Sequence, residues 1–95
     1  MMEAKERNMK LERYVEALNK CANGYQTYSI KAGRKWIKIM TSHSKHYPHA
    51  FVDLDGNIYK PASYDQPYPK VRYHLDDIEW LEKNVDQFGS YLYAQ

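Results

Sequence analysis

The stretch "HAFVDLDGNIYKPASY", from His49 to Tyr64, predicts the centre of an antiparallel β-sheet. Its halves "HAFVDL" and "NIYK" are short and rich in aromatic and β-branched residues, as strands are. Between them stand Asp55 and Gly56, a dipeptide typical of hairpin turns. A helix-loop-helix calcium site starting at Asp53 would need glycine at its sixth position and an acid at its twelfth, where Tyr64 stands. We therefore expect a hairpin here and no metal site.

Upstream of this hairpin, apolar residues first recur at helical spacing and then alternate. The buried stripe of a helix from about Met9 to Ala22 is expected to consist of Leu11, Tyr14, Val15, Leu18, Cys21 and Ala22. Residues 1–8 repeat at no such spacing, and we expect them to be disordered or frayed.

The stretch "YQTYSIKAGRKWIKIM", which follows Gly24, predicts two strands joined by a turn at Gly33. In the second strand, Ile37 and Ile39 share one face. The opposite face is expected to carry Trp36, Lys38 and Met40.

Downstream, three of the four prolines fall between Pro61 and Pro69, so regular strand pairing is expected to stop there. "KVRY" then predicts an edge strand. Asp76 or Asp77 is the expected N-cap of a short helix, and the tail "SYLYAQ" is expected to form a last strand. The predicted fold class is α+β: an antiparallel sheet of four to five short strands packed on an N-terminal amphipathic helix, with a short C-terminal helix. Residues 9–95 are expected to form a single domain.

The composition excludes several classes of protein. The 95 residues suffice for one domain and contain no apolar run long enough to span a membrane. The N-terminus lacks the apolar core of a signal peptide, so we expect the protein to act inside a cell. Cys21 is the only cysteine, which excludes an internal disulfide and a multi-cysteine zinc site. No phosphate-cradling glycine loop and no catalytic motif occurs, so we expect a non-enzymatic protein without a cofactor.

The charge is unevenly distributed. Residues 1–74 hold 13 Lys or Arg against 7 Asp or Glu, whereas residues 75–95 hold 1 against 5. No acid occurs between Glu16 and Asp53, a segment that contains six lysines or arginines and three histidines. This acid-free segment predicts contact with an anionic partner.

The three histidines of this segment, His43, His46 and His49, stand three residues apart in "HSKHYPH". Imidazoles can ligate zinc, but the segment reads as a loop and offers no fourth donor before Asp53. We therefore favour contact with phosphate, or plain solvation, over a metal site.

The leading functional hypothesis is a basic, aromatic sheet face that binds nucleic acid or a nucleotide, because a ring can stack on a base while flanking cations hold phosphates. The alternative reading of the same residues is that Trp36 belongs to the core and the lysines only keep an edge soluble. The expected ligand-binding residues are Arg34, Lys35, Trp36, Lys38, His43, His46, His49, Lys60 and Arg72.

The rival hypothesis is a protein-binding module that inhibits or recruits another factor. The chain has ten tyrosines, and tyrosine is favoured at the centres of interfaces. The expected partner-binding residues, in and after the segment "PASYDQPYP", are Tyr64, Tyr68 and Tyr73.

At "GRKWIKI", "HAFVDLDGNIYKPAS", "VRY" and "VDQFGSYLY", together about 60 of the 95 residues with the spacers between them, the chain resembles small uncharacterised proteins of tailed bacteriophages. The residues that carry the resemblance are Arg34, Lys35, Trp36, His49, Phe51, Val52, Asp53, Gly56, Tyr59, Lys60, Ala62, Ser63 and Arg72. The chain departs from that pattern at Tyr64, where a tryptophan is usual, and at Tyr73, where a glycine is usual. The resemblance implies a viral protein in the host cytoplasm, whose partner would be a host factor under the rival hypothesis. A structural role in the virion is a weaker alternative.

Overall fold

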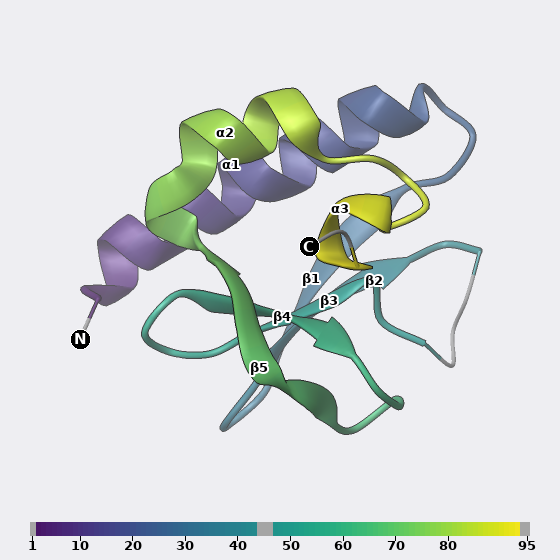
Figure 1. Cartoon of the computed structure of the whole chain (residues 1–95). Helices are drawn as coiled ribbons and strands as arrows, with labels where there is room; N and C mark the ends of the chain where they lie inside the picture. Colours follow the sequence, from purple (N-terminus) through teal and green to yellow (C-terminus); the bar gives the residue numbers. More distant parts are fainter. Residues whose placement is uncertain (1, 44–46, 94–95) are drawn as a thin grey trace.

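The computed structural model describes residues 2–43 and 47–93, in which one antiparallel sheet carries its helices on one side (Figure 1). The elements are α1 (Ala4–Ala22), β1 (Tyr28–Ala32), β2 (Ile37–Thr41), β3 (Ala50–Val52), β4 (Asn57–Pro61), β5 (Pro67–His74), the 3-10 turn η1 (Leu75–Asp77), α2 (Ile78–Asn84) and α3 (Ser90–Tyr93). The five strands follow one another across the sheet in chain order. The predicted α+β fold is confirmed.

The helix α1 begins at Ala4, five residues before the predicted start at Met9. Residues 4–8, which we expected to be frayed, are helical because the first turns make contacts outside the helix. The guanidinium of Arg7 donates to the carbonyl oxygen of Leu54 at 3.3 Å. Met2, just ahead of the helix, packs against the hydrophobic core.

The core lies between the helices and the helix-side face of the sheet. Its fully buried members include Leu18 of α1, Ile39 of β2 and Leu81 of α2. Ile37 and Ile39 face this core, as the two-residue period of a strand predicts. Cys21, expected in the buried stripe of α1, is instead exposed. The neighbouring Ala22 is buried at the end of the helix.

Strand β5 corrects the expectation for the proline-rich segment. The strands separate over residues 62–66, but Pro61 and Pro67 are Cα partners in the β4–β5 ladder, which continues to His74 with register shifts on either side of Tyr59. An edge strand tolerates proline because no further strand needs the missing N–H group. The gap closes as a tight turn, in which the N–H groups of Ala62 and Ser63 both donate to the carbonyl oxygen of Gln66 at 3.0 Å.

Asp77 is the N-cap residue of α2, as predicted, although its side chain makes no capping hydrogen bond to that helix. The side-chain cap belongs to the preceding turn η1, where the Nδ1 of His74 accepts from the Asp76 N–H at 3.0 Å and the Asp77 carboxylate accepts from the His74 N–H at 3.1 Å. The predicted last strand is wrong, since residues 90–93 form helix α3. The carboxylate of Asp86 satisfies free N–H groups at the start of α3, which favours a helical turn there.

Candidate functional site

The face of the sheet opposite the helices, here called the outer face, carries one row of side chains that crosses all five strands. The strand register makes direct neighbours of Lys31, Lys38, Phe51, Tyr59 and Val71, one residue from each of β1 to β5. Phe51 is fully buried although it lies outside the helix-side core. The outer face is therefore a second packed layer and not a bare sheet surface.

Trp36 covers this layer at the start of β2. Its ring lies edge-on to Phe51, with the centroids 5.9 Å apart, and edge-on to Tyr59 at 5.2 Å. Trp36 is half-buried, which places it between the two readings of the sequence: it packs on Phe51 and still reaches the surface. Trp36 and Lys38 share a face, as expected, and Tyr59 joins them.

Two lysines stand directly opposite each other on the outer face, Lys31 on β1 and Lys38 on β2. Tyr64, from the loop over residues 62–66, lies against both. The ammonium of Lys31 donates to the Tyr64 hydroxyl at 2.9 Å, and the Nζ of Lys38 lies 3.9 Å from the centroid of its ring. The hydrogen bond from Lys31 lowers the pKa of the Tyr64 phenol below its ordinary value, with smaller contributions from the charges of Lys31 and Lys38.

Asp65 provides the carboxylate for this pair. Its Oδ1 lies 3.3 Å from the Nζ of Lys38, whose side chain is only 15% exposed, whereas that of Asp65 is 78% exposed. Lys38 is therefore covered by the 62–66 loop of the same chain. Tyr47 fixes this loop from the other side by donating its hydroxyl to the carbonyl oxygen of Ala62 at 2.6 Å.

Arg34 and Lys35 lie exposed at the tip of the β1–β2 hairpin. The turn is tight because the Gly33 N–H donates to the carbonyl oxygen of Trp36 at 3.0 Å, and a Cβ on Gly33 would lie 2.9 Å from that oxygen. Lys35 reaches back to within 5.6 Å of the Trp36 ring. We call the four cations Lys31, Arg34, Lys35 and Lys38 the basic hairpin.

The histidines do not form one loop site. His43 is exposed and lies edge-on to Tyr25, with the ring centroids 4.8 Å apart, and His46 falls outside the described residues. His49 is only 9% exposed, so its imidazole is not presented on the surface with the other predicted ligand residues. Its Nε2 is hydrogen-bonded to the Tyr91 hydroxyl at 2.7 Å. Burial lowers the pKa of His49 to about 4, against a smaller opposing effect of Asp86.

This buried histidine ties three elements together. The Tyr91 hydroxyl of α3 bridges His49, next to β3, and the hydroxyl of Tyr14 in α1, with the two phenol oxygens 2.5 Å apart. Burial raises the pKa of Tyr91 well above its ordinary value, so the phenol stays neutral. The cluster has a structural role: it satisfies buried polar atoms and fixes α3 on the sheet.

Lys60 and Arg72 are separated from the basic hairpin. Lys60 follows Tyr59 in β4 and therefore faces the helix side, where its Nζ lies between the rings of Tyr68 and Tyr93. Arg72 lies half-buried in β5, at the opposite edge of the sheet from β1. The structure therefore brings together only part of the predicted ligand set.

The three tyrosines expected to bind a partner are also divided. Tyr64 lies on the outer face, while Tyr73 faces the helix side and stacks on Trp80 of α2, with ring centroids 4.8 Å apart and an interplanar angle of 25°. Tyr68 joins Lys60 and Tyr93. The sequence reasoning missed Trp80 and Tyr93 because they come from separate helices and no spacing relates them to β5.

Lys31 was also missing from the predicted ligand residues, although the sequence held a signal for it. Counting outward from the turn at Gly33, with Ala32 opposite Ile37, places Lys31 opposite Lys38.

The Asp53 carboxylate organises the central turn. It accepts hydrogen bonds from the N–H groups of Asp55 and Asn57, from the Asn57 amide and from the Tyr59 hydroxyl, all between 2.9 and 3.0 Å. Gly56 completes the turn with a φ of +89°, which favours glycine. In the described ranges, no group of three or more His, Cys, Asp or Glu side chains is placed to hold a metal ion.

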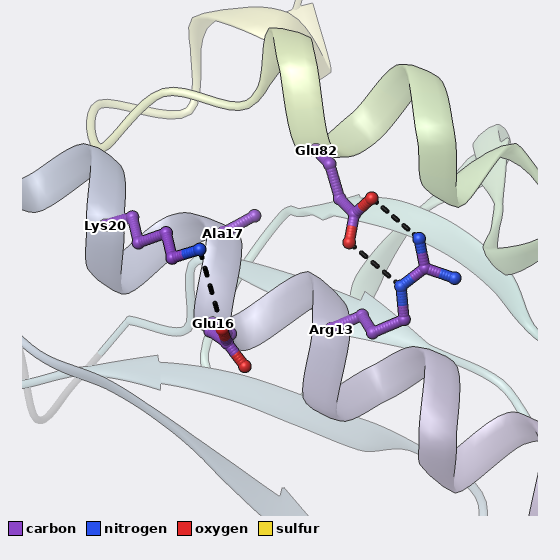
Figure 2. Close-up of a pocket in the computed structure, with 5 residues that line it drawn as sticks. All are labelled: Arg13, Glu16, Ala17, Lys20 and Glu82. Atoms are coloured by element: carbon purple, nitrogen blue, oxygen red, sulfur yellow. Dashed lines mark hydrogen bonds and ion pairs between the residues drawn. The ribbon is translucent and has the colours of Figure 1, made fainter.

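A groove between α1 and α2 is also lined by charged residues (Figure 2). Its charges are already paired: Arg13 makes a bidentate contact with Glu82 at 2.7 and 2.9 Å, and Lys20 lies 3.6 Å from Glu16. The groove thus joins the two helices and presents no unbalanced charge to a ligand. We place the candidate site at the basic hairpin instead.

Comparison with known proteins identifies a family for this chain but no individual relative. No curated protein and no solved structure matches it. Within residues 2–43 and 47–93, no helix is long and apolar enough to cross a membrane. A family model matches residues 1–94, and the chain therefore belongs to the family described as "Family of unknown function (DUF7717)".

Proposed function

We propose that this chain is a non-enzymatic, phage-like binding protein that holds nucleic acid or a nucleotide at its basic hairpin, inside the infected cell. The observation that carries the proposal is the pair Lys31 and Lys38. Like charges directly opposite on neighbouring strands destabilise a sheet. Proteins accept such locally destabilising arrangements most often at functional sites.

The chemistry around the pair suits a phosphorylated ligand that also carries a flat ring. Arg34 and Lys35 extend the positive charge to the exposed tip, where phosphates can reach them. Trp36 and Tyr64 provide rings beside the cations, and rings of this kind stack on bases.

Asp65 and Tyr64 themselves resemble such a ligand, since they present a carboxylate and a ring to Lys38. A bound phosphate would replace the carboxylate of Asp65 beside Lys38. Binding therefore involves displacement of the Asp65 carboxylate alone, which its ion pair opposes only weakly because Asp65 is largely exposed, while Tyr47 still holds the loop at Ala62.

The proposal is tested by fluorescence anisotropy with a labelled single-stranded oligothymidylate and, separately, a fluorescent ATP analogue. The oligonucleotide affinity is expected to fall steeply between about 50 and about 200 mM salt. The double variant Arg34→Ala/Lys35→Ala should weaken binding and reduce the slope of log affinity against log salt by about 1.4, the value for two lost phosphate contacts on a single strand.

The matched control is Lys5→Ala/Lys83→Ala, which removes two exposed charges on the helix side. It should change the affinity and the salt slope much less than the hairpin variant. Equal weakening by both variants, or no binding of either probe at about 50 mM salt, would sink the proposal.

A further inference from the structure

A second surface lies on the helix side, where aromatic residues of β5, α2 and α3 lie beside one another and two of them contact Lys60. Figure 1 shows α3 between α2 and the strands. The exposed fractions are 51% for Tyr68, 43% for Trp80 and 53% for Tyr93, while Tyr73 is half-buried. We call the four rings and Lys60 the aromatic surface.

The rings are connected through a small number of contacts. Tyr73 stacks on Trp80 and donates its hydroxyl to the carbonyl oxygen of Tyr91 at 2.8 Å, which fixes β5 against α3. Two residues further along α3, the Tyr93 ring lies 4.6 Å from the Nζ of Lys60. The Tyr68 ring also contacts that ammonium, with its centroid at 4.4 Å.

Lys60 is the unusual member. It is half-buried, and among the described residues no carboxylate lies within ion-pair distance of its Nζ. The two rings offset part of the cost of desolvating the ammonium, since a cation is attracted to the face of an aromatic ring. Within residues 2–43 and 47–93, no anion compensates the charge, so an anion is the group that would complete the surface.

We infer that the aromatic surface binds an extended segment of another protein, one that places a single Asp or Glu carboxylate at Lys60 and apolar side chains on Tyr73 and Trp80. Tryptophan and tyrosine are the residues most often found at the energetic centres of interfaces. A carboxylate delivered to a partly desolvated ammonium gains a charge-assisted hydrogen bond. This inference uses none of the basic hairpin and stands independently of the function proposed for it.

The local charge selects a protein segment over a nucleic acid. Residues 75–95, which supply α2 and α3, contain five acids and one lysine. Asp76 and Glu79, at the start of this region, are exposed. A polyanion would be repelled there, whereas one carboxylate with apolar neighbours meets Lys60 at little cost.

The test starts from a library of random peptides displayed on beads, which is selected on the intact protein. Enriched peptides are expected to share one acidic residue beside apolar or aromatic ones. Each is synthesised with its Glu or Asp and with the matching Gln or Asn, and we expect the amide version to bind about tenfold more weakly, a loss of about 1.4 kcal/mol.

Variants of the protein then locate the site. Lys60→Met should abolish the preference for the acidic peptide, and Lys60→Arg should retain it, which separates the charge from a structural role of the side chain. Trp80→Ala should weaken both peptides alike. Arg34→Ala/Lys35→Ala should leave peptide binding unchanged, just as Lys60→Met should leave oligonucleotide binding unchanged, so the two proposals can fail separately.

The inference is overturned if no peptide is enriched, or if Lys60→Met binds the acidic and amide peptides with the wild-type ratio. It is also overturned if light scattering shows a dimer that Trp80→Ala dissociates, because the occupant would then be a second copy of this chain.

Discussion

The basic hairpin and the aromatic surface both hold lysines against tyrosine rings, but they differ in how the charge is compensated. On the outer face, Asp65 pairs with Lys38 and the Tyr64 hydroxyl accepts from Lys31. On the helix side, the Nζ of Lys60 lies against the rings of Tyr68 and Tyr93, with no carboxylate of the described residues within ion-pair distance. A ligand at the hairpin must therefore compete with the carboxylate of Asp65, whereas a ligand at the aromatic surface adds a carboxylate where the described residues supply none.

The largest expected effect comes from Phe51→Ala, which removes the support beneath Trp36 on the outer face. Phe51 is fully buried, and truncation of a buried phenylalanine costs about 3 to 5 kcal/mol of unfolding free energy. Urea unfolding measures the loss, and anisotropy should show weaker oligonucleotide binding with little change at the aromatic surface. Val71→Ala, in the same row but 45% exposed, is the control and should cost much less. Equal costs would show that the outer face is not a packed layer.

Acid is expected to affect the aromatic surface before the basic hairpin. The pKa of His49 is about 4 in the folded protein and 6.5 in the unfolded chain, so between these values the unfolded chain binds more protons. Stability is complete above pH 6.5 and falls as the pH drops towards 4, by about 3 kcal/mol in total. Because His49 bonds to Tyr91, the loss should first loosen α3 and with it Tyr93.

Hydrogen exchange and chemical unfolding between pH 7 and pH 4 would follow this change. His49→Gln, which keeps a hydrogen-bonding side chain but does not titrate, should remove most of the pH dependence in this window. A wild-type protein that is as stable near pH 4 as at neutral pH would contradict the prediction.

The smallest effect is expected for Asp65→Asn, which removes the carboxylate that competes at Lys38. The oligonucleotide affinity should rise a few-fold, while the unfolding free energy changes by less than about 1 kcal/mol, since Asp65 is largely exposed. Asp55→Asn makes the same change of charge away from the basic hairpin. If both variants raise the affinity equally, the cause is net charge and not competition by Asp65.

The sequence allowed the hairpins and the shared face of Trp36 and Lys38 to be predicted, because strand alternation and turn chemistry act over a few residues. It could not reveal that the 62–66 loop would fold over Lys38. That contact joins residues 27 positions apart and depends on the path of the loop. The start of α1 was placed too late for a related reason: Arg7 is held by Leu54, which no local pattern indicates.

For "HAFVDLDGNIYKPASY", local sequence was enough to predict the hairpin, because Asp53 and Gly56 direct the turn through local hydrogen bonds and backbone freedom. The roles of the two ends of this stretch depend on contacts with distant elements. His49 became a buried, neutral anchor for α3, and Lys60 turned to the aromatic surface instead of the basic hairpin. The reason is that burial and charge pairing depend on which distant elements cover a side chain, and alternation along a strand specifies only the face.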